Sequence, residues 1–132
     1  MTLLLDSSVL CAFINPKDVH HLQARTLMQA VLSSQYGNVL FTDYIFDETV
    51  TVLLRKVSKD AALEMGTYLL QSGFAMAPIE SSVFNDAWKL FQQLEMSFTD
   101  CTSLAFLKSF KVEYIATFDK GFRNKGVKVV GV

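Results

Sequence analysis

The chain has 132 residues, is 51% hydrophobic and 19% charged, and carries a formal net charge of −1. Its length and composition are those of one globular domain, residues 1–132, and so small a net charge gives no overall attraction to nucleic acid. We expect no membrane span, because no apolar run approaches ~20 residues, and no signal peptide, because Asp6 interrupts the first apolar run. Cys11 and Cys101 lack the spacing of a disulfide scaffold or a zinc finger. A reducing cytoplasm is therefore the expected location.

The first expected elements are one strand and two helices. Thr2–Leu5 is a short apolar segment without polar alternation, which is typical of a strand buried on both faces. Ser7 or Ser8 then caps a short helix, which ends at Asn15-Pro16 because proline cannot continue it. The second helix is expected from about His20 to Ser33.

Strand and helix signals alternate through the rest of the chain. Thr42 or Asp43 caps a long helix, and Ser58 caps the next one. Thr99 is the expected cap of a later helix, with Asp100 in its first position, where the helix dipole favours a carboxylate. The remaining expected elements are the strands Val39–Phe41, Phe74–Ile79, Val112–Phe118 and Val127–Val130, the helices Lys59–Gln71 and Ser81 or Ser82 to Leu94, and a helical turn at Asp119–Phe122.

Five strands that alternate with helices predict an α/β domain of three layers, α/β/α, around a mostly parallel five-stranded sheet. The methionine and aromatic residues around Trp88 and Phe91 have helical spacing, and we expect them in the core rather than in a cofactor pocket. In open sheets of this kind, ligands bind beyond the carboxyl ends of the strands, near the point where the strand order reverses.

Four acids lie where the chain passes this edge of the predicted sheet. Asp6 directly follows the first strand and Asp119 the fourth, whereas Glu48 lies in the first turns of the helix after the second strand. Asp100 begins the helix that leads into the fourth strand, so it starts at the same edge. We therefore expect the four carboxylates to lie near one another.

Gathered carboxylates repel one another, so their ionised forms need a compensating cation. Their oxygens suit Mg²⁺ or Mn²⁺, which lower the pKa of a bound water and stabilise charge on a phosphoryl oxygen. Ser8 and Thr117 lie close to the acids in sequence and can add hydroxyl groups. His20 and His21 have no partners at metal-ligand spacing, and we expect them at the surface. Since no glycine-rich phosphate loop and no Ser-His-acid arrangement accompanies the acids, they favour metal-assisted phosphodiester hydrolysis.

Four segments, in this order, carry a resemblance to a known family. They are Leu4–Leu10, Thr42–Thr49, Ser97–Ala105 and Ile115–Phe122. Each motif is weak alone, but the ordered set spans essentially the whole chain. On these residues the sequence resembles the PIN-domain family of metal-dependent ribonucleases.

The resemblance implies that four acids form the family's metal-binding and catalytic set, supported by two hydroxyl groups: Asp6, Glu48, Asp100, Asp119, Ser8 and Thr117. It implies cleavage of RNA with Mg²⁺ or Mn²⁺, with Asp119 either binding the ion or reaching it through water. Many small members are toxins of toxin–antitoxin pairs of the VapC type, so the resemblance also implies an antitoxin partner and a homodimer. We expect Lys120, Arg123 and Lys125 to hold the RNA backbone.

The residues leave open which acid of the long helix is the ligand, and they leave two other functions open. Asp43 and Asp47 lie close to Glu48, and helix geometry alone does not decide which acid points into the site. A phosphoryl-accepting, Mg²⁺-binding signalling domain is one alternative, although serines rather than a second acid follow Asp6. A non-catalytic RNA-binding or interaction module, whose acids are structural, is the other.

Overall fold

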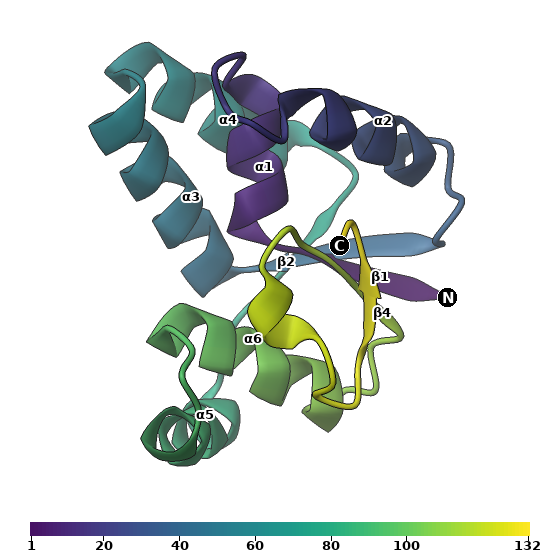
Figure 1. Ribbon diagram of the computed structural model, residues 1–132, viewed down its shortest axis with the longest axis vertical. Coiled ribbons are helices and arrows are strands. Elements are labelled where there is room, and N and C mark those ends of the chain that lie inside the picture. The colour runs from purple at the N-terminus through teal and green to yellow at the C-terminus, as the bar shows by residue number, and fades with distance from the viewer.

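The computed structural model describes residues 1–132. Five strands and six α-helices follow one another along the chain, with one 3₁₀ turn near the C-terminus (Figure 1). The strands are β1 Thr2–Leu5, β2 Asn38–Thr42, β3 Ala75–Ala77, β4 Tyr114–Ala116 and β5 Lys128–Val130. The helices are α1 Ser7–Ile14, α2 His21–Leu32, α3 Asp43–Lys56, α4 Lys59–Gln71, α5 Ser81–Gln93 and α6 Phe98–Ser109, and the 3₁₀ turn η1 is Lys120–Phe122.

All five strands are parallel and form one sheet in the order β3-β2-β1-β4-β5. The central strand is β1, in which Leu4 pairs with Leu40 of β2 on one side and with Ile115 of β4 on the other. Leu3, Leu4 and Leu5 are fully buried, as the unbroken apolar run predicts. The strand order reverses between β1 and β4, because the chain extends from β1 to β3 on one side and later adds β4 and β5 on the other.

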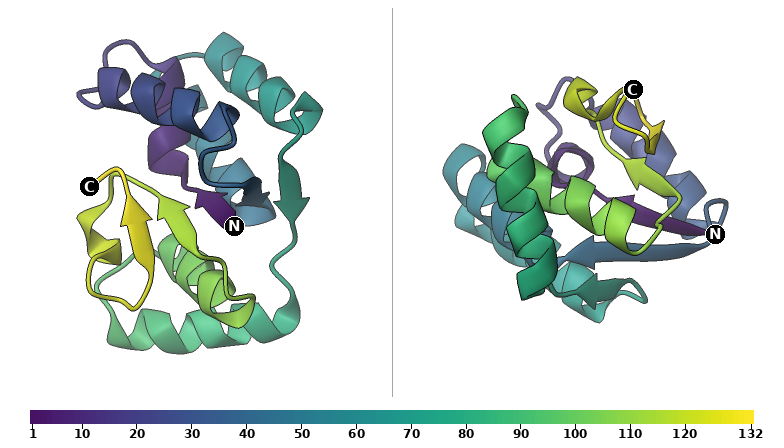
Figure 2. Two further views of the ribbon diagram at one scale, coloured as in Figure 1. Left: turned by 90° about the vertical axis from the view of Figure 1, so that its right-hand side faces the viewer. Right: turned by 90° about the horizontal axis from the view of Figure 1, so that it is seen from below.

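Helices cover both faces of this sheet. Helices α1, α2, α3 and α4 lie on one side, and α5 and α6 lie on the other (Figures 1 and 2). The predicted three-layer α/β/α class is therefore confirmed, and the sheet is entirely parallel. None of the helices combines the length and the apolar character needed to cross a membrane.

Two of the expected helix caps fix the starts of α3 and α4. Thr42 Oγ1 accepts the Ile45 N–H at 3.0 Å, and Ser58 Oγ accepts the Ala61 N–H at 3.0 Å. Each hydroxyl satisfies an amide that has no partner inside its own helix. Because β2 leads directly into the Thr42 cap, α3 begins at the carboxyl end of the sheet.

The expected cap of α6 was wrong by two residues. Ser97 rather than Thr99 is the cap, and its Oγ accepts the Asp100 N–H at 3.1 Å. Asp100 is consequently the third residue of α6 instead of the first. It still lies in the first turn, where the positive end of the helix dipole favours a carboxylate.

The expectation that the aromatic side chains of α5 belong to the core was also wrong. Phe84, Trp88 and Phe91 remain 39%, 51% and 40% exposed, whereas the smaller Val83 and Ala87 are buried. Helix α5 therefore buries a narrow stripe of small side chains, and its rings lie beside that stripe. They contact one another, as in the stacked rings of Trp88 and Phe91, whose centroids are 5.7 Å apart.

Candidate metal centre

Asp6 lies at the point where the strand order reverses. Its N–H donates to the carbonyl oxygen of Ala116 at 3.0 Å, which joins the end of β1 to the end of β4. Asp6 is 2% exposed, and its Oδ2 accepts from Thr117 Oγ1 at 2.7 Å and from Ser8 Oγ at 2.9 Å. Its Oδ1 is buried without any hydrogen-bond partner. Since an unpaired buried carboxylate oxygen is costly, Oδ1 indicates a site for a ligand.

Glu48 approaches Asp6 from the second turn of α3. The hydroxyl of Ser7, the first residue of α1, donates to Glu48 Oε1 and holds this carboxylate near the end of β1. The other two acids of α3 lie elsewhere. Asp43 accepts a backbone N–H from the segment after β3 at 3.0 Å, and Asp47 is exposed. Of the three acids in α3, only Glu48 belongs to the cluster.

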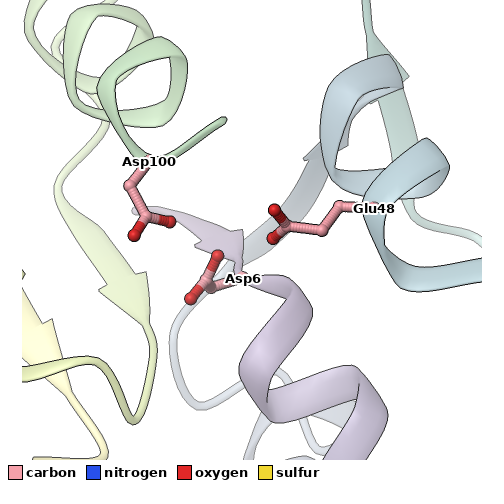
Figure 3. Close-up of side chains that lie close together, drawn as sticks. All are labelled: Asp6, Glu48 and Asp100. Atoms are coloured by element: carbon pink, nitrogen blue, oxygen red, sulfur yellow. The ribbon is translucent and has the colours of Figure 1, made fainter. Parts of the chain in front are cut away.

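Asp100 reaches the same point from the first turn of α6 (Figure 3). One carboxylate oxygen each from Asp6, Glu48 and Asp100 lie within 4.8 Å of one another. Asp100 is 7% exposed and Glu48 is partly exposed. Three elements that are distant in sequence thus bring three carboxylates to a separation at which one ion can contact them all.

Burial and mutual repulsion oppose ionisation of this cluster. Burial raises the pKa of Asp6 above its ordinary value, and the charge of Glu48 raises it further, although the hydroxyl groups bonded to Asp6 act in the other direction. Burial also raises the pKa of Asp100 to about 8, with further contributions from the charge of Asp6, from a hydrogen bond and the charge of Asp119, and from Glu48. A cation at the centre would remove both penalties.

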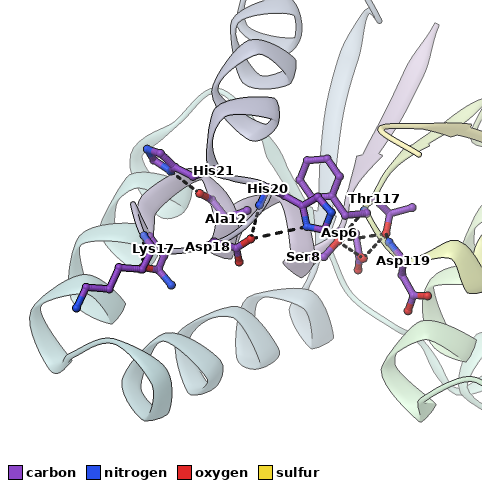
Figure 4. Close-up of polar contacts among 11 residues, drawn as sticks. Asp6, Ser8, Ala12, Lys17, Asp18, His20, His21, Thr117 and Asp119 are labelled. Atoms are coloured by element: carbon purple, nitrogen blue, oxygen red, sulfur yellow. Dashed lines mark hydrogen bonds and ion pairs between the residues drawn. The ribbon is translucent and has the colours of Figure 1, made fainter.

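Asp119 lies at the exposed edge of the site and outside the cluster of three. Its Oδ1 accepts a backbone N–H of η1 at 2.8 Å, and its own N–H donates to Thr117 Oγ1 at 3.0 Å. Ser8 Oγ accepts the Phe118 N–H at 3.0 Å (Figure 4). The two hydroxyl groups singled out in the sequence therefore tie Asp6 to the segment after β4.

The donors present fit a hard divalent cation. All three clustered side chains are carboxylates, the ligand type that such cations prefer, and Asp6 Oδ1 has no other partner. Asp6, Glu48 and Asp100 are the residues that could hold the ion. His20 and His21 lie outside this cluster.

Other predicted site residues lie on the segment after β4. Lys120 and Arg123 are exposed, Lys125 is partly exposed, and none of them forms an ion pair. Sequence reasoning considers Ser7 only as a helix cap and so misses its hydrogen bond to Glu48. The available signal was its position directly after Asp6, at the start of α1.

The PIN domain family matches residues 3–128 of this chain. A VapC ribonuclease from Archaeoglobus fulgidus is 26% identical over 133 residues, which cover 92% of this chain and 80% of that protein. The crystal structure of VapC20 from Mycobacterium tuberculosis, a toxin that cleaves the sarcin-ricin loop, has a TM-score of 0.85 at 24% identity and covers 98% of both chains. FitAcB from Neisseria gonorrhoeae has a TM-score of 0.64 at 18% identity, covering 96% of this chain and 95% of that one.

The structural similarities show a shared fold, and the family match extends over nearly the whole chain, including all three clustered acids. The chain therefore belongs to the PIN domain family.

Proposed function

We propose that this chain is a metal-dependent endoribonuclease of the VapC toxin type, a single domain of residues 1–132 that acts in the cytoplasm. The cluster of Asp6, Glu48 and Asp100, with its buried and unpaired Asp6 Oδ1, is the observation that carries the proposal. The similarity to the VapC ribonuclease of Archaeoglobus fulgidus and to VapC20 supports RNA as the substrate. Both cysteines are free thiols, which suits a reducing compartment.

Asp6, Glu48 and Asp100 would hold Mg²⁺ or Mn²⁺, because a set of carboxylate oxygens suits these ions. When bound, such an ion makes a water molecule more acidic and stabilises negative charge on a phosphoryl oxygen. The protein supplies the arrangement of the donors. Asp6 Oδ2 is held by two hydroxyl groups, which leaves Oδ1 directed at the site, and Ser7 holds Glu48.

The remaining predicted residues have supporting roles in this proposal. Asp119 completes the pocket on the side of Asp100, whose pKa it raises. Lys120, Arg123 and Lys125 are free of ion pairs, and they contact the RNA phosphates on the segment next to Asp119.

A protein partner is part of the same proposal. VapC20 is a toxin, and the similar structure FitAB, bound to an IR36 DNA fragment, has a TM-score of 0.64 at 18% identity. From this likeness we propose that a cognate antitoxin binds this chain and that the chain forms a homodimer. Size-exclusion chromatography with light scattering measures the homodimer directly.

The test is cleavage of a panel of structured and single-stranded RNAs with Mn²⁺ by the wild type, Asp100→Asn and Asp47→Asn. We expect the wild type and Asp47→Asn to cleave, because Asp47 lies outside the cluster, and Asp100→Asn to be inactive. Chelation should stop cleavage. Equal cleavage by the wild type and Asp100→Asn would contradict the mechanism. If the wild type neither cleaves RNA nor binds Mn²⁺ in a calorimetric titration, the chain is not this enzyme.

A further inference from the structure

A groove adjoins the acidic cluster, and the roles described above leave Asp18, His20 and Lys56 in its lining without a function. Its volume is about 290 Å³, close to the smallest small-molecule sites, which begin at roughly 300 Å³. We call it the His20 groove and define it by its main lining residues, Ser8, Asp18, His20, Lys56, Phe118 and Asp119. The groove borders the site, because its lining residue Ser8 donates to Asp6 Oδ2.

An aromatic surface forms one wall of the His20 groove. The imidazole ring of His20 stacks on the ring of Phe118, with centroids 4.6 Å apart and an interplanar angle of 11°. Phe118 is buried, whereas the side chain of His20 is 40% exposed, so part of the imidazole ring remains accessible to a ligand. The backbone N–H of His20 donates to Asp18 Oδ1 at 2.8 Å, and the backbone N–H of Phe118 donates to Ser8 Oγ at 3.0 Å. The Ser8 hydroxyl, which donates to Asp6, therefore also fixes the backbone of Phe118 beneath the His20 ring.

A lysine side chain lies at the α3 end of the groove. Lys56, in the last turn of α3, is exposed and forms no ion pair. It follows Glu48 by two helical turns, which is about 12 Å along the helix axis. This spacing places Lys56 beyond Glu48 along α3, where its ammonium group can act on a neighbouring phosphate of the RNA.

We propose that the His20 groove holds an unpaired nucleotide of the RNA, next to the cleaved phosphate, with its base stacked on His20 and its phosphate near Lys56. This inference rests on the proposed ribonuclease function. Unpaired bases stack on aromatic and histidine rings, and such stacking is a main mode of recognition of single-stranded RNA. The carboxylates of Asp18 and Asp119 also line the groove and repel a phosphate, so the base rather than the phosphate lies beside them.

The test measures RNA binding rather than cleavage. The parent protein is the Asp100→Asn variant, and the probe is a fluorescein-labelled single-stranded RNA of mixed sequence, followed by fluorescence anisotropy. In this background, His20→Leu keeps an apolar cover on Phe118 but has no ring, whereas His20→Phe keeps a ring. Melting temperatures of both variants verify that they are folded.

We expect His20→Leu to weaken binding about tenfold and His20→Phe to bind within about twofold of the parent, because stacking needs the ring. A blunt RNA duplex offers no unpaired base, so its binding should not depend on His20. Lys56→Ala should weaken binding and reduce the slope of log K against log salt concentration by about 0.7, the contribution of one phosphate contact on a single strand. Lys89→Ala, an exposed lysine of α5 outside the groove, is the matched control and should leave the slope unchanged.

Equal binding by the parent and His20→Leu would overturn the inference, as would failure of His20→Phe to bind like the parent. An unchanged salt slope for Lys56→Ala, or a parent that binds no single-stranded RNA, would also overturn it. These outcomes are separate from the cleavage test. Metal-dependent cleavage by the wild type together with unaltered binding by His20→Leu would leave the ribonuclease proposal standing and reject the groove alone.

Discussion

Replacing Asp100 by asparagine should stabilise the metal-free protein, although it removes a proposed metal ligand. Burial and the neighbouring carboxylates raise the pKa of Asp100 from 3.8 to about 8. Because its folded-state pKa exceeds the unfolded value, the folded protein binds the proton more tightly, and stability falls as pH rises from 3.8 toward 8. Asparagine has nearly the same shape and no charge, so the variant escapes this loss.

The size of the effect follows from the two pKa values. At pH 7, which lies 7 − 3.8 = 3.2 units above the unfolded value, the destabilisation is about 4 kcal/mol, and at pH 5 it is about 2 kcal/mol. With an unfolding entropy of about 2.1 cal/mol/K per residue over 132 residues, these become about 14 °C and about 7 °C in Tm. Both are upper bounds, because any side-chain movement that admits water to Asp100 lowers its desolvation penalty.

The assay is thermal unfolding in EDTA, followed by circular dichroism at pH 5 and pH 7. Asp47→Asn is the control, since Asp47 is exposed on α3 outside the cluster, and its Tm should stay within about 2 °C of the wild type. Added Mn²⁺ should stabilise the wild type, by about 2.7 kcal/mol at 100 times the dissociation constant, and should stabilise Asp100→Asn much less. The reasoning is refuted if Asp100→Asn melts with the wild type in EDTA, or if its advantage shrinks as pH rises.

Asp119→Asn should retain part of the Mn²⁺ affinity that Asp6→Asn abolishes, because Asp119 lies outside the cluster of three; calorimetric titration compares them, and equal losses would contradict this placement. Thr117→Val removes the donor to Asp6 Oδ2 and should lower the free energy of unfolding by about 1–3 kcal/mol in urea, together with the Mn²⁺ affinity. A loss of stability without any change in Mn²⁺ affinity would show that the Thr117 hydroxyl does not contribute to metal binding. Thr42→Ala should cost about 1 kcal/mol through loss of the cap on Ile45, with Mn²⁺ affinity unchanged.

The sequence predicted elements best where a local signal decides the structure. The run Leu3–Leu5 has no polar residue on either face, and this part of the central strand is fully buried. For α3 the sequence left Thr42 or Asp43 open as the cap, and for α4 it predicted Ser58; Thr42 and Ser58 are the caps, because each hydroxyl accepts an unpaired N–H of the first turn. At α6 the sequence predicted Thr99 as the cap, whereas the helix begins two residues earlier than this implies, at Phe98, and Ser97 accepts the Asp100 N–H.

Features that depend on tertiary packing were predicted less well from the sequence. The strand expected at 112–118 is restricted to Tyr114–Ala116, because pairing continues only where β1 and β5 run alongside. The rings of α5 have helical spacing, but Val83 and Ala87 show that only a narrow stripe of this helix is buried. Spacing alone does not report the width of a buried stripe.

The candidate site likewise has features that the sequence predicts and features that only tertiary packing decides. Strand ends and the reversal point predicted that the acids would meet at one edge, since this follows from parallel topology. The choice of Glu48 over Asp47 depends on which side of α3 packs against α1, where the Ser7 hydroxyl donates to Glu48, and the sequence of the helix alone does not decide this. Likewise, the ring contact between His20 and Phe118 joins segments far apart in the chain, so no sequence pattern indicated the groove.

The energetics of the cluster explain why its acids are better read as a binding site than as structural residues. A structural carboxylate in a protein interior is stabilised when both of its oxygens have donors, as Asp6 Oδ2 does from two hydroxyl groups. Asp6 Oδ1 has none, and its neighbours are two more carboxylates rather than cations. The fold therefore satisfies one side of Asp6 and leaves the other side, shared with Glu48 and Asp100, electrostatically unfavourable. A divalent cation bound there would attract all three carboxylates at once, and folding stability and metal affinity would then be linked through the same few oxygen atoms.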